Sequence, residues 1–467
     1  MSFKYAAYEV ANGHYVLPRV GKMRTEAHVW MSPALYEASE ENMWGQLANA
    51  ASYEGVTAVH LLPDGHSGFG VPVGSVVVTE DTLIQAASGY DISCGILVLR
   101  VPEVTAEKVQ GRYIRERLIS EIEKRVGTGL GSARPKLMPS YTQKKVDEVL
   151  HFGAKALGVN TDLCERAYIP VPSNIDLRKI EKAYIKALPQ LGSLGSGNHF
   201  CEVLLDESGV LWVMIHTGSR GYGWQTANHY FYEGAKARGL PSNRREDSWL
   251  SISEPLGKEY WAYHNSAANY AIANRHAIAL AVQEALDVVF GTQGEVYYEI
   301  SHNLIQEETL VLPDGTTKKG FVHRKGSTRA FPAGHPDLMG TRWEKTGHPC
   351  LIPGSMFHGA SILFPQKGAH QSACSVNHGS GRILARGEAK RKLGGQQAKL
   401  DDEMRNVKRT FNGVQVEGIT TNTKHVVVDE CSRVYKDLDS VLEVLRDTGI
   451  AQLAHRLWPV ANIKGAD

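Results

Sequence analysis

The chain has 467 residues, of which 42% are hydrophobic and 22% are charged, and this balance is typical of a globular protein. Its 51 Lys and Arg residues nearly match its 50 Asp and Glu residues, for a formal net charge of +1. A broadly basic coat is therefore excluded, and any nucleic acid must bind to a local basic patch.

Cysteine usage and apolar patterning indicate the cellular compartment of the protein. The six cysteines form no CxxC pair, which suits free thiols in a reducing compartment. No run approaches the roughly 18 apolar residues of a membrane span, and the amino-terminal residues lack the apolar core of a signal peptide. We therefore expect a cytoplasmic protein without a membrane partner.

Short apolar runs rich in Val, Ile, Leu and Tyr predict buried strands. In chain order they cover residues 56–62, 96–101, 203–205, 211–215 and 296–300.

Three helices are predicted between and after these strands. Apolar residues at four-residue spacing predict a helix over residues 114–126 that ends at Gly127. The alanine-rich stretch 259–290 predicts a long buried helix, and residues 438–445 predict an amphipathic one. Because strands and helices mix without a regular βαβ rhythm, the sequence predicts an α+β fold. We expect one large domain over residues 1–467, with mixed β-sheets packed against helices.

Five residues that end or flank the apolar runs carry side chains that bind divalent metals: Asp91, Cys94, His199, His216 and His302. Glycine or small polar residues stand beside each of them, as in GYDISCG, GSGNHF, MIHTGSRG and EISHN. Side chains in such settings can converge on a cleft. A thiolate can also bridge two metal ions, so the set predicts a metal site.

Each of these residues also has a simpler explanation. Asp91 and Cys94 fit a turn-capping aspartate beside a buried structural cysteine. A single histidine at a strand end is more often a satisfied core or surface residue than a ligand, but three such histidines are harder to explain by packing alone. Asn198 and Glu202 stand on either side of His199 and suit the hydrogen bonds that orient a metal-bound imidazole.

A further histidine, His378, lies in the segment SVNHGSGRILARGEAKRK. The backbone N–H groups of residues 379–381 suit a phosphate, and the basic residues that follow, among them Arg386, suit an RNA backbone. A histidine in this setting can attack a nucleoside triphosphate and form a phosphoramidate. Asp64, in PDGHSGFG, can hold an imidazole in one tautomer or support a metal. The alternative is a solvated basic helix with an incidental histidine.

Other segments suit phosphate or nucleotide. Arg220 is a natural phosphate fork, and residues 323–334, with Arg324 and Lys325, predict a phosphate-contact loop. The small residues of 353–361 predict a loop around a base or ribose.

Taken in order, these segments resemble the RtcB family of RNA-splicing ligases. The motifs are PDGHSGFG, GYDISCG, LGSGNHF, MIHTGSRG, SHN, HRKGSTRAFPAG, IPGSM, NHGSGR and YKDLDSV. They extend over nearly the whole chain to the terminal LWPVANIKG, while the first sixty residues match less clearly. The resemblance implies an RtcB-like fold.

The resemblance also implies an activity in RNA repair or tRNA splicing. The family joins RNA ends that carry a 2′,3′-cyclic phosphate or 3′-phosphate to ends that carry a 5′-hydroxyl, using GTP and Mn²⁺. By carry-over, GTP would guanylylate His378, GMP would pass to the RNA 3′-phosphate, and the 5′-hydroxyl would displace it. Asp64 would support the histidine step, and a helper protein is a possible partner.

Two Mn²⁺ ions per subunit are implied. Asp91, Cys94 and His199 would hold one ion. Cys94, His216 and His302 would hold the other, with Cys94 as the bridge. Two cations suit phosphoryl transfer, because they neutralise the triphosphate and keep attacking and leaving atoms in line. Manganese itself rests on the resemblance, since the ligand types suit zinc equally well.

The implied guanine-nucleotide residues come from the same motifs. They are Asn198, His199, Phe200, Cys201, Glu202, His302, Asn303, Pro353, Gly354, Ser355, Met356, Ser361, His378, Gly379, Ser380, Gly381, Tyr435 and Lys464. Tyr435 would stack on the guanine. The expected RNA or phosphate contacts are Arg220, Arg324, Lys325 and Arg386.

The chain departs from the family pattern in two places, both at the implied nucleotide pocket. Asn377 stands where family members usually carry a cysteine, and the loop FHGAS after IPGSM is one residue longer than the common form. The metal-ligand types are all retained. Two other functions stay open: a metal-dependent phosphohydrolase that activates water, and a non-catalytic RNA-binding subunit.

Overall fold

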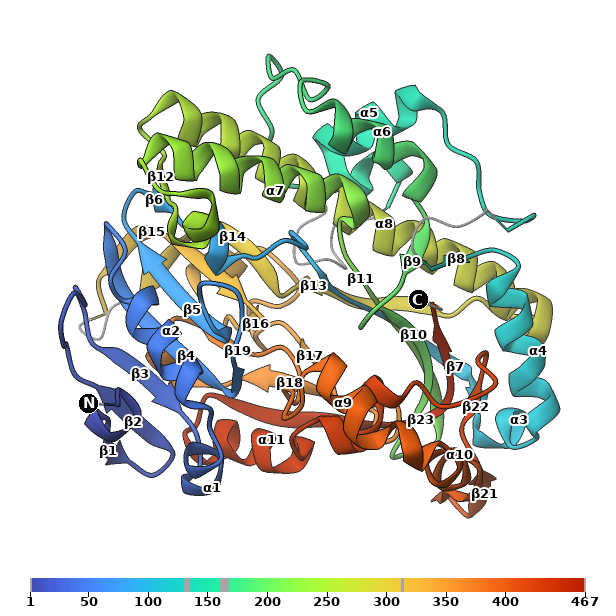
Figure 1. Ribbon diagram of the computed structural model, residues 1–467. Helices are drawn as coiled ribbons and strands as arrows, with labels where there is room; N and C mark the ends of the chain where they lie inside the picture. Colours follow the sequence, from blue (N-terminus) through green and yellow to red (C-terminus); the bar gives the residue numbers. More distant parts are fainter. Residues whose placement is uncertain (1, 130–134, 160–167, 312–314, 466–467) are drawn as a thin grey trace.

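A computed structural model describes residues 2–129, 135–159, 168–311 and 315–465. Two large β-sheets form the centre of the molecule (Figure 1). The first has seven strands in the order β1-β2-β3-β4-β5-β15-β14. They are β1 (Tyr8–Ala11), β2 (His14–Leu17), β3 (Ala27–Trp30), β4 (Val56–His66), β5 (Val73–Thr79), β14 (Asn303–Val311) and β15 (Thr317–Lys325).

The second sheet has eight strands in the order β13-β7-β11-β10-β23-β18-β17, with β22 beside β23. They are β7 (Gly95–Thr105), β10 (Phe200–Asp206), β11 (Val210–Thr217), β13 (Glu295–Ser301), β17 (Cys350–Pro353), β18 (Ala360–Pro365), β22 (Thr420–Thr421) and β23 (Ala451–Lys464). Both sheets are mixed, because β3 pairs with β4 and β22 pairs with β23 in parallel, whereas β10 and β11 run antiparallel, as do β4 and β5.

The remaining strands among the described residues form four two-stranded sheets. They pair β6 (Thr82–Leu83) with β12 (Leu250–Ser251), β8 (Gly127–Thr128) with β9 (Ser193–Gly195), β16 (Ser327–Arg329) with β19 (Ser375–Asn377), and β20 (Lys408–Phe411) with β21 (Val414–Glu417).

Helices cover the sheets on two sides. In Figure 1, α5 to α8 lie above the sheets and α9 to α11 lie below them. The described α-helices are α1 (Pro33–Glu37), α2 (Glu41–Ala50), α3 (Ala106–Val109), α4 (Arg112–Glu123), α5 (Gln143–Phe152), α6 (Glu181–Gln190), α7 (Arg220–Ala237), α8 (Pro255–Phe290), α9 (Arg386–Leu393), α10 (Gln397–Asn406) and α11 (Leu438–Asp447).

The central strands are buried on both faces. In β11, Trp212 and Met214 pack into one apolar cluster, and the residues between and beside them pack into another. Successive side chains of a strand point to opposite faces, and each fully buried one contributes about 1.5–3 kcal/mol. This burial anchors the end of β11, which carries His216.

The long helix α8 has clear local boundaries. Pro255 occupies its first turn, where a missing N–H costs no hydrogen bond. Gly291 follows its last residue with a φ of +72°, and its N–H donates to the Asp287 carbonyl. The prediction of a long buried helix over 259–290 is confirmed, with an earlier start.

The helix predicted to end at Gly127 is shorter than expected, because α4 ends at Glu123. The N–H group of Val126 bonds to the Ile122 carbonyl and closes a turn, and Gly127 then pairs with Ser193 in the β8–β9 sheet. A turn over residues 124–126 therefore replaces the last part of the predicted helix, and strand pairing begins at Gly127.

The predicted phosphate-contact loop over 323–334 is also corrected. Its first residues belong to β15, and Ser327–Arg329 form β16 against β19. Because β15 bonds to β14 on one side and β5 on the other, strand pairing overrides the local Gly and Ser content. The α+β class with mixed sheets is confirmed.

Two further expectations concern cysteines and membranes. The five cysteines that the structure describes are all buried, and Cys164 lies outside the described residues. No helix among the described residues is long and apolar enough to cross a membrane.

Candidate active site

The predicted metal ligands meet where strands of both large sheets end. Cys94 directly precedes β7, His199 directly precedes β10, and His216 lies near the end of β11. His302 connects β13 of the eight-stranded sheet to β14 of the seven-stranded sheet. The topology therefore brings together residues that lie far apart in the sequence.

A cavity of about 320 Å³ lies at these strand ends, a volume typical of small-molecule sites. Most residues singled out in the sequence line it. They are Asp91, Cys94, Asn198, Phe200, Glu202, His216, His302, Asn303, Lys325, Pro353, Gly354, Ser355, Met356, His378, Gly379, Ser380, Gly381, Arg386, Tyr435 and Lys464.

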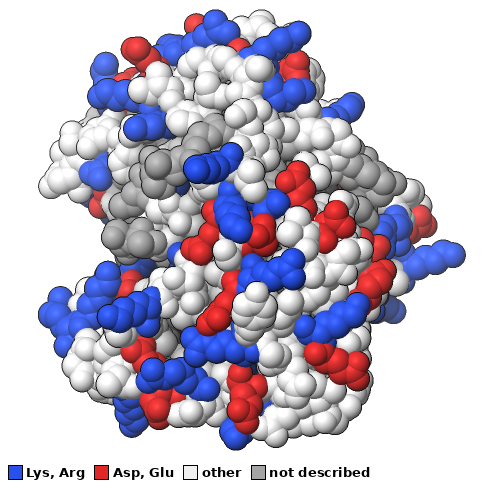
Figure 2. Space-filling view, turned by 90° about the vertical axis from the view of Figure 1, so that its right-hand side faces the viewer, with Lys and Arg blue, Asp and Glu red and all other residues white. Residues whose placement is uncertain are grey.

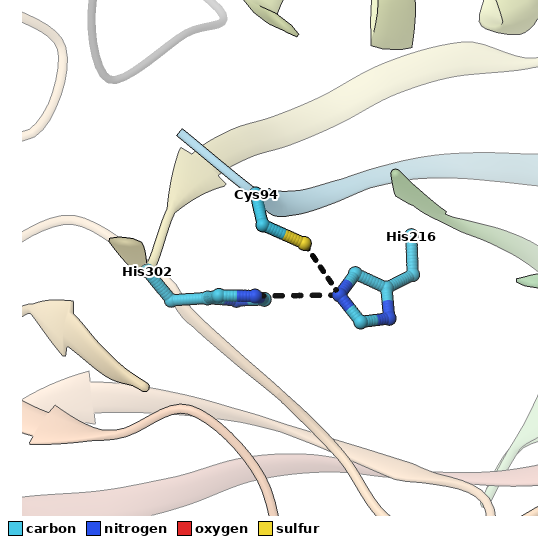
Figure 3. A group of neighbouring side chains, drawn as sticks. All are labelled: Cys94, His216 and His302. Carbon is cyan, nitrogen blue, oxygen red and sulfur yellow. Dashed lines mark hydrogen bonds between the residues drawn. The ribbon is translucent and has the colours of Figure 1, made fainter. Parts of the chain in front are cut away.

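Two groups of side chains have ligand atoms close enough to share a metal ion. One is Asp91, Cys94 and His199, and the other is Cys94, His216 and His302; within each group the ligand atoms lie within 4.8 Å of one another. The Cys94 Sγ atom lies 3.1 Å from Nε2 of His216 and 3.5 Å from Nε2 of His199. Figure 3 shows the second group, with Cys94 and His302 both directed at the His216 ring. The thiol common to both groups agrees with a bridging role.

A hydrogen bond of His216 and the burial of His216 and His302 favour the form of these imidazoles that can bind metal. Nδ1 of His216 donates to the Asn198 carbonyl at 3.0 Å, so Nε2 presents its lone pair to Cys94 and His302. Burial lowers the pKa of His216 and of His302 well below the usual range, and neighbouring histidines lower both further. Both rings are therefore neutral, which is the form that binds metal.

The Cys94 thiol and the Asp91 carboxyl differ in how readily they lose a proton when no cation is bound. Burial raises the pKa of Cys94 well above its usual value, and Asp91 raises it further. Burial also raises the pKa of Asp91, but the hydrogen bond with His199 and its charge outweigh this and lower the pKa to about 2. A divalent cation would convert the buried thiol to a thiolate. The donor set therefore fits divalent metal.

A buried arginine holds the ligand-bearing segments together. Arg275, from α8, pairs with Glu299 and donates to the carbonyls of Ser93 at 2.6 Å and Thr217 at 3.0 Å. It also donates to the Ser301 hydroxyl at 3.1 Å. Each of the last three residues is next to a metal-ligand candidate in the chain. Arg275 was not predicted from the sequence, because nothing in the alanine-rich stretch distinguishes it.

His378 follows β19 and faces the same cavity. Its Nδ1 lies 2.7 Å from Oδ2 of Asp64, so Nδ1–H donates to the carboxylate and Nε2 keeps its lone pair. The His378 ring lies 4.9 Å from the His302 ring, measured between centroids. Gly326, with a φ of +62°, leaves room for it, because a Cβ there would lie 3.0 Å from Cε1 of His378. The nucleophile candidate thus adjoins the second ligand group.

An ion-pair network borders another part of the cavity. The Glu430 carboxylate lies 3.1 Å from Nζ of Lys464, 3.3 Å from Arg382 and 3.7 Å from Arg386. It also accepts a hydrogen bond from the Tyr435 hydroxyl at 2.5 Å. Burial raises the pKa of Glu430, but Lys464, Tyr435 and the two arginines outweigh it and lower the pKa. Glu430 was not predicted from the sequence, because isolated acidic residues are too common to indicate a site.

Glu202 faces the cavity from β10 and is 3% exposed. Burial raises the pKa of its carboxyl to about 8, although Lys464 and Arg409 act to lower it. A carboxyl with this pKa is largely protonated at neutral pH, and it can donate a hydrogen bond to a ligand.

Comparison with known proteins decides the family. Residues 46–465 match the family model described as tRNA-splicing ligase RtcB. The chain belongs to the RtcB family. It is similar to the tRNA-splicing ligase RtcB of Thermococcus kodakarensis, at 34% identity over 96% of this chain and 97% of that protein. It is also similar to the RNA-splicing ligase RtcB of Mycobacterium tuberculosis, at 32% identity over 90% of this chain and 100% of that protein.

Two side chains implied by the RtcB resemblance lie away from the cavity. Cys201 packs into an apolar cluster on the face of β10 opposite Phe200 and Glu202. The Ser361 hydroxyl accepts a hydrogen bond from Arg456 at 2.9 Å and does not line the cavity. Nucleotide contacts by these two residues stay predictions.

Two of the four residues expected to contact phosphate bond to other groups of the protein. Arg324 is 1% exposed and bonds to both carboxylate oxygens of Glu308, at 2.5 and 2.9 Å. A core ion pair therefore holds the charge of Arg324, and its phosphate contact stays a prediction. Arg220 donates to the Ser193 hydroxyl and to the Gly129 carbonyl, each at 3.2 Å, and lies outside the cavity lining.

The remaining two basic residues line the cavity. Burial lowers the pKa of Lys325 to about 7, and its ammonium donates to the carbonyls of Phe69 and Val71. The side chain of Arg386 is 43% exposed. Figure 2 shows basic and acidic side chains interspersed over one face of the molecule, which agrees with local basic contacts within a nearly neutral chain.

Proposed function

We propose that this chain is an RNA ligase that joins ends carrying a 2′,3′-cyclic phosphate or a 3′-phosphate to ends carrying a 5′-hydroxyl, in RNA repair or tRNA splicing. The relatives described above are named tRNA-splicing and RNA-splicing ligases. The observation that carries the proposal is the Asp64–His378 pair beside two metal-ligand groups at one cavity. A nucleophile and cation ligands at one place suit phosphoryl transfer.

In the first proposed step, Nε2 of His378 attacks the α-phosphorus of GTP. An N–P bond forms, the bond from the α-phosphorus to the α,β-bridging oxygen breaks, and pyrophosphate leaves. Asp64 keeps the Nδ1 proton in place and offsets the positive charge that develops on the ring. The product is a guanylylated histidine.

In the second step, an oxygen of the RNA 3′-phosphate attacks the same phosphorus. The N–P bond breaks, and His378 returns to its neutral form. In the third step, the 5′-hydroxyl of the other RNA end attacks the 3′-phosphate phosphorus, GMP leaves, and the hydroxyl proton is released to solvent. A 2′,3′-cyclic phosphate must first be opened by water to give the 3′-phosphate.

Mn²⁺ is the proposed cofactor, held by the two ligand groups that share Cys94. When bound there, the ions would neutralise phosphate oxygens and stabilise the charge that develops in each transfer. The choice of manganese over zinc follows from the family resemblance, since Cys and His ligands suit both metals.

GTP is proposed to occupy the cavity of about 320 Å³. The backbone N–H groups of residues 379–381 and the small residues 353–356 border this space and suit phosphate and ribose. The guanidinium of Arg382 lies 5.0 Å from the Tyr435 ring, so guanine would stack on the other face of that ring. Lys464 would approach the nucleotide by exchanging its contact with Glu430.

A labelled-nucleotide experiment tests the mechanism. The protein is incubated with Mn²⁺ and α-³²P-labelled GTP, and we expect an acid-labile covalent GMP adduct that maps to His378. His378→Ala should form no adduct. A phosphohydrolase would instead release phosphate without any protein-bound nucleotide, and this outcome with the wild-type chain would overturn the proposal.

Three further expectations stay predictions. We infer that the ligase unit spans residues 1–467, because β1 to β3 continue the sheet that contains β4 and the Thermococcus relative aligns with 96% of the chain. The cytoplasmic location and the helper protein rest on sequence alone.

A further inference from the structure

A patch of four aromatic residues and one arginine borders the cavity and has no part in the steps above. It consists of Phe69, Tyr90, Trp224, Tyr232 and Arg245, and is called the aromatic patch below. Tyr90 lines the cavity and directly precedes a metal-ligand candidate in the chain. Trp224 and Tyr232 come from α7, and Arg245 comes from the segment that follows it.

The central feature of the aromatic patch is a stacked pair of rings. Trp224 stacks on Tyr90, with centroids 5.6 Å apart and an interplanar angle of 21°. Phe69 and Phe231 contact the Tyr90 ring at 5.4 and 4.8 Å and hold it in place. Trp224 is nevertheless 46% exposed. Tyr90 covers one face of the indole, and among the described residues Tyr90 is the ring recorded as stacking on Trp224, so the exposed part of the indole suits a further ring.

Arg245 adds positive charge to the aromatic patch. It donates to the Tyr90 hydroxyl at 3.3 Å, and its guanidinium lies 5.2 Å from the Tyr232 ring. Within the part of the chain that the structure describes, Arg245 forms no ion pair, whereas its neighbour Arg244 pairs with Asp247. The charge of Arg245 is therefore available to an anion.

We propose that the aromatic patch binds one nucleotide of an RNA strand at its reacting end, with the base stacked on Trp224 and a phosphate near Arg245. This inference rests on the proposed function. Bases of single-stranded RNA stack on exposed aromatic side chains, and neighbouring cations follow the backbone. A base inside a duplex is already stacked, so the patch selects single-stranded ends.

An RNA strand fits the aromatic patch better than a protein partner does. The patch is continuous with the cavity through Tyr90. An RNA strand whose terminal phosphate reacts in the cavity would therefore lie across the aromatic patch. Its charged member is an arginine without an ion-pair partner among the described residues, which complements a polyanion.

RNA binding by single variants is the first test. The full chain with Mn²⁺ and without GTP is titrated with a short fluorescent single-stranded RNA that carries a 3′-phosphate. Trp224→Ala should weaken binding about tenfold, the effect of losing one stacked base. Trp224→Phe keeps a ring and should lose much less. Tyr113→Ala, which removes a 78% exposed ring from α4, is the matched control and should bind like the wild type.

A double-mutant cycle separates stacking from a general structural effect. An abasic nucleotide is moved along the strand from its end, and each RNA is titrated against the wild type and Trp224→Ala. We expect the abasic change to weaken wild-type binding at one position only and to have no effect there in Trp224→Ala. A second series with a 5′-hydroxyl end shows which of the two strands lies on the aromatic patch.

Two outcomes would overturn the inference: unchanged RNA binding by Trp224→Ala, as a protein-docking role predicts, or equal abasic losses in both proteins at every position. The GMP adduct forms without RNA, so Trp224→Ala should form it at the wild-type rate. Absence of the adduct in the wild type would remove the proposed function, whereas the titrations would still decide whether the aromatic patch binds RNA.

Discussion

Two clusters of histidines in this molecule differ in what they can do. The first is the pair of ligand groups at the cavity, joined through Cys94. The second, called the sheet cluster here, consists of His14, His28 and His60 on the neighbouring strands β2, β3 and β4. His14 Nε2 lies 3.0 Å from His28 Nδ1, and the rings of His28 and His60 stack with centroids 5.4 Å apart.

The difference indicates that donor variety and convergence, and not the number of imidazoles, make the cavity the candidate metal site. The sheet cluster is not part of any described group of three ligand atoms within 4.8 Å. Its rings lie along one face of a sheet and bond or stack with one another, with Trp30 stacked on His14. At the cavity, a thiol and a carboxylate join the imidazoles, and the strands end there, so side chains from several directions meet.

Cys94→Ala should have the largest effect, because it removes the atom common to both ligand groups. We expect ligation to fall by more than the roughly 10–100-fold lost when a supporting residue is removed, and bound Mn²⁺ to be at least halved. Elemental analysis of the purified protein measures the metal. The His28→Ala variant is the matched control and should bind as much Mn²⁺ as the wild type. An equal loss of Mn²⁺ in that variant would show that the two clusters do not differ in metal binding.

Asp64→Asn should slow guanylylation by about 10³–10⁴-fold, the scale of an amide replacement in a carboxylate–histidine pair. The amide would donate to Nδ1 and leave the proton on Nε2, so the nucleophilic lone pair is lost. The rate of GMP adduct formation measures this. Beside the sheet cluster, Glu26 lies 3.5 Å from His28 Nε2, and Glu26→Gln should leave the rate unchanged. Wild-type rates in Asp64→Asn would refute the assigned role.

Lys464→Ala should weaken GTP binding by about 10–100-fold, the range for a lost hydrogen bond to a charged group. RNA affinity should change much less, because the side chain is 4% exposed and bonds within the cavity. Parallel titrations with GTP and RNA separate the two, and Lys464→Arg tests whether charge alone suffices. Equal losses for both ligands would show that the residue is structural.

The smallest effect concerns acid stability and belongs to the sheet cluster. Burial lowers the pKa of His60 to about 3 and that of His14 to about 4, against an ordinary value of about 6.5. Between these values the unfolded chain binds more protons, so the free energy of unfolding falls as the pH falls, by at most about 1.4 kcal/mol per pH unit for each group.

His60→Leu removes one of these groups. The variant should therefore lose less stability than the wild type from about pH 6.5 to 4 and show the same pH dependence above that range. Urea denaturation of the metal-free proteins at a series of pH values measures the slopes. Identical acid slopes would mean that His60 is already accessible to protons in the folded state.

Sequence patterns predicted strands and motifs better than they predicted side-chain environments. The runs behind β4, β7, β10, β11 and β13 and the alanine-rich helix were predicted because their apolar content is local. Arg324 was assigned to phosphate because its neighbours are Gly, Ser and cations, and only the fold reveals Glu308 beside it. Arg275 and Glu430 were not predicted for the same reason, since the groups to which they bond lie elsewhere in the chain.

The sequence by itself determined the ligand types, the nucleophile candidate and the family motifs that surround them. Only the tertiary structure decided which of these residues meet. Gly95 of β7 pairs with Thr217 of β11 on one side and with Ser301 of β13 on the other, and this register sets Cys94, His216 and His302 at adjacent strand ends. Because a shift of one residue in either pairing would move those side chains to the opposite face, the site depends on strand register, which no local pattern specifies.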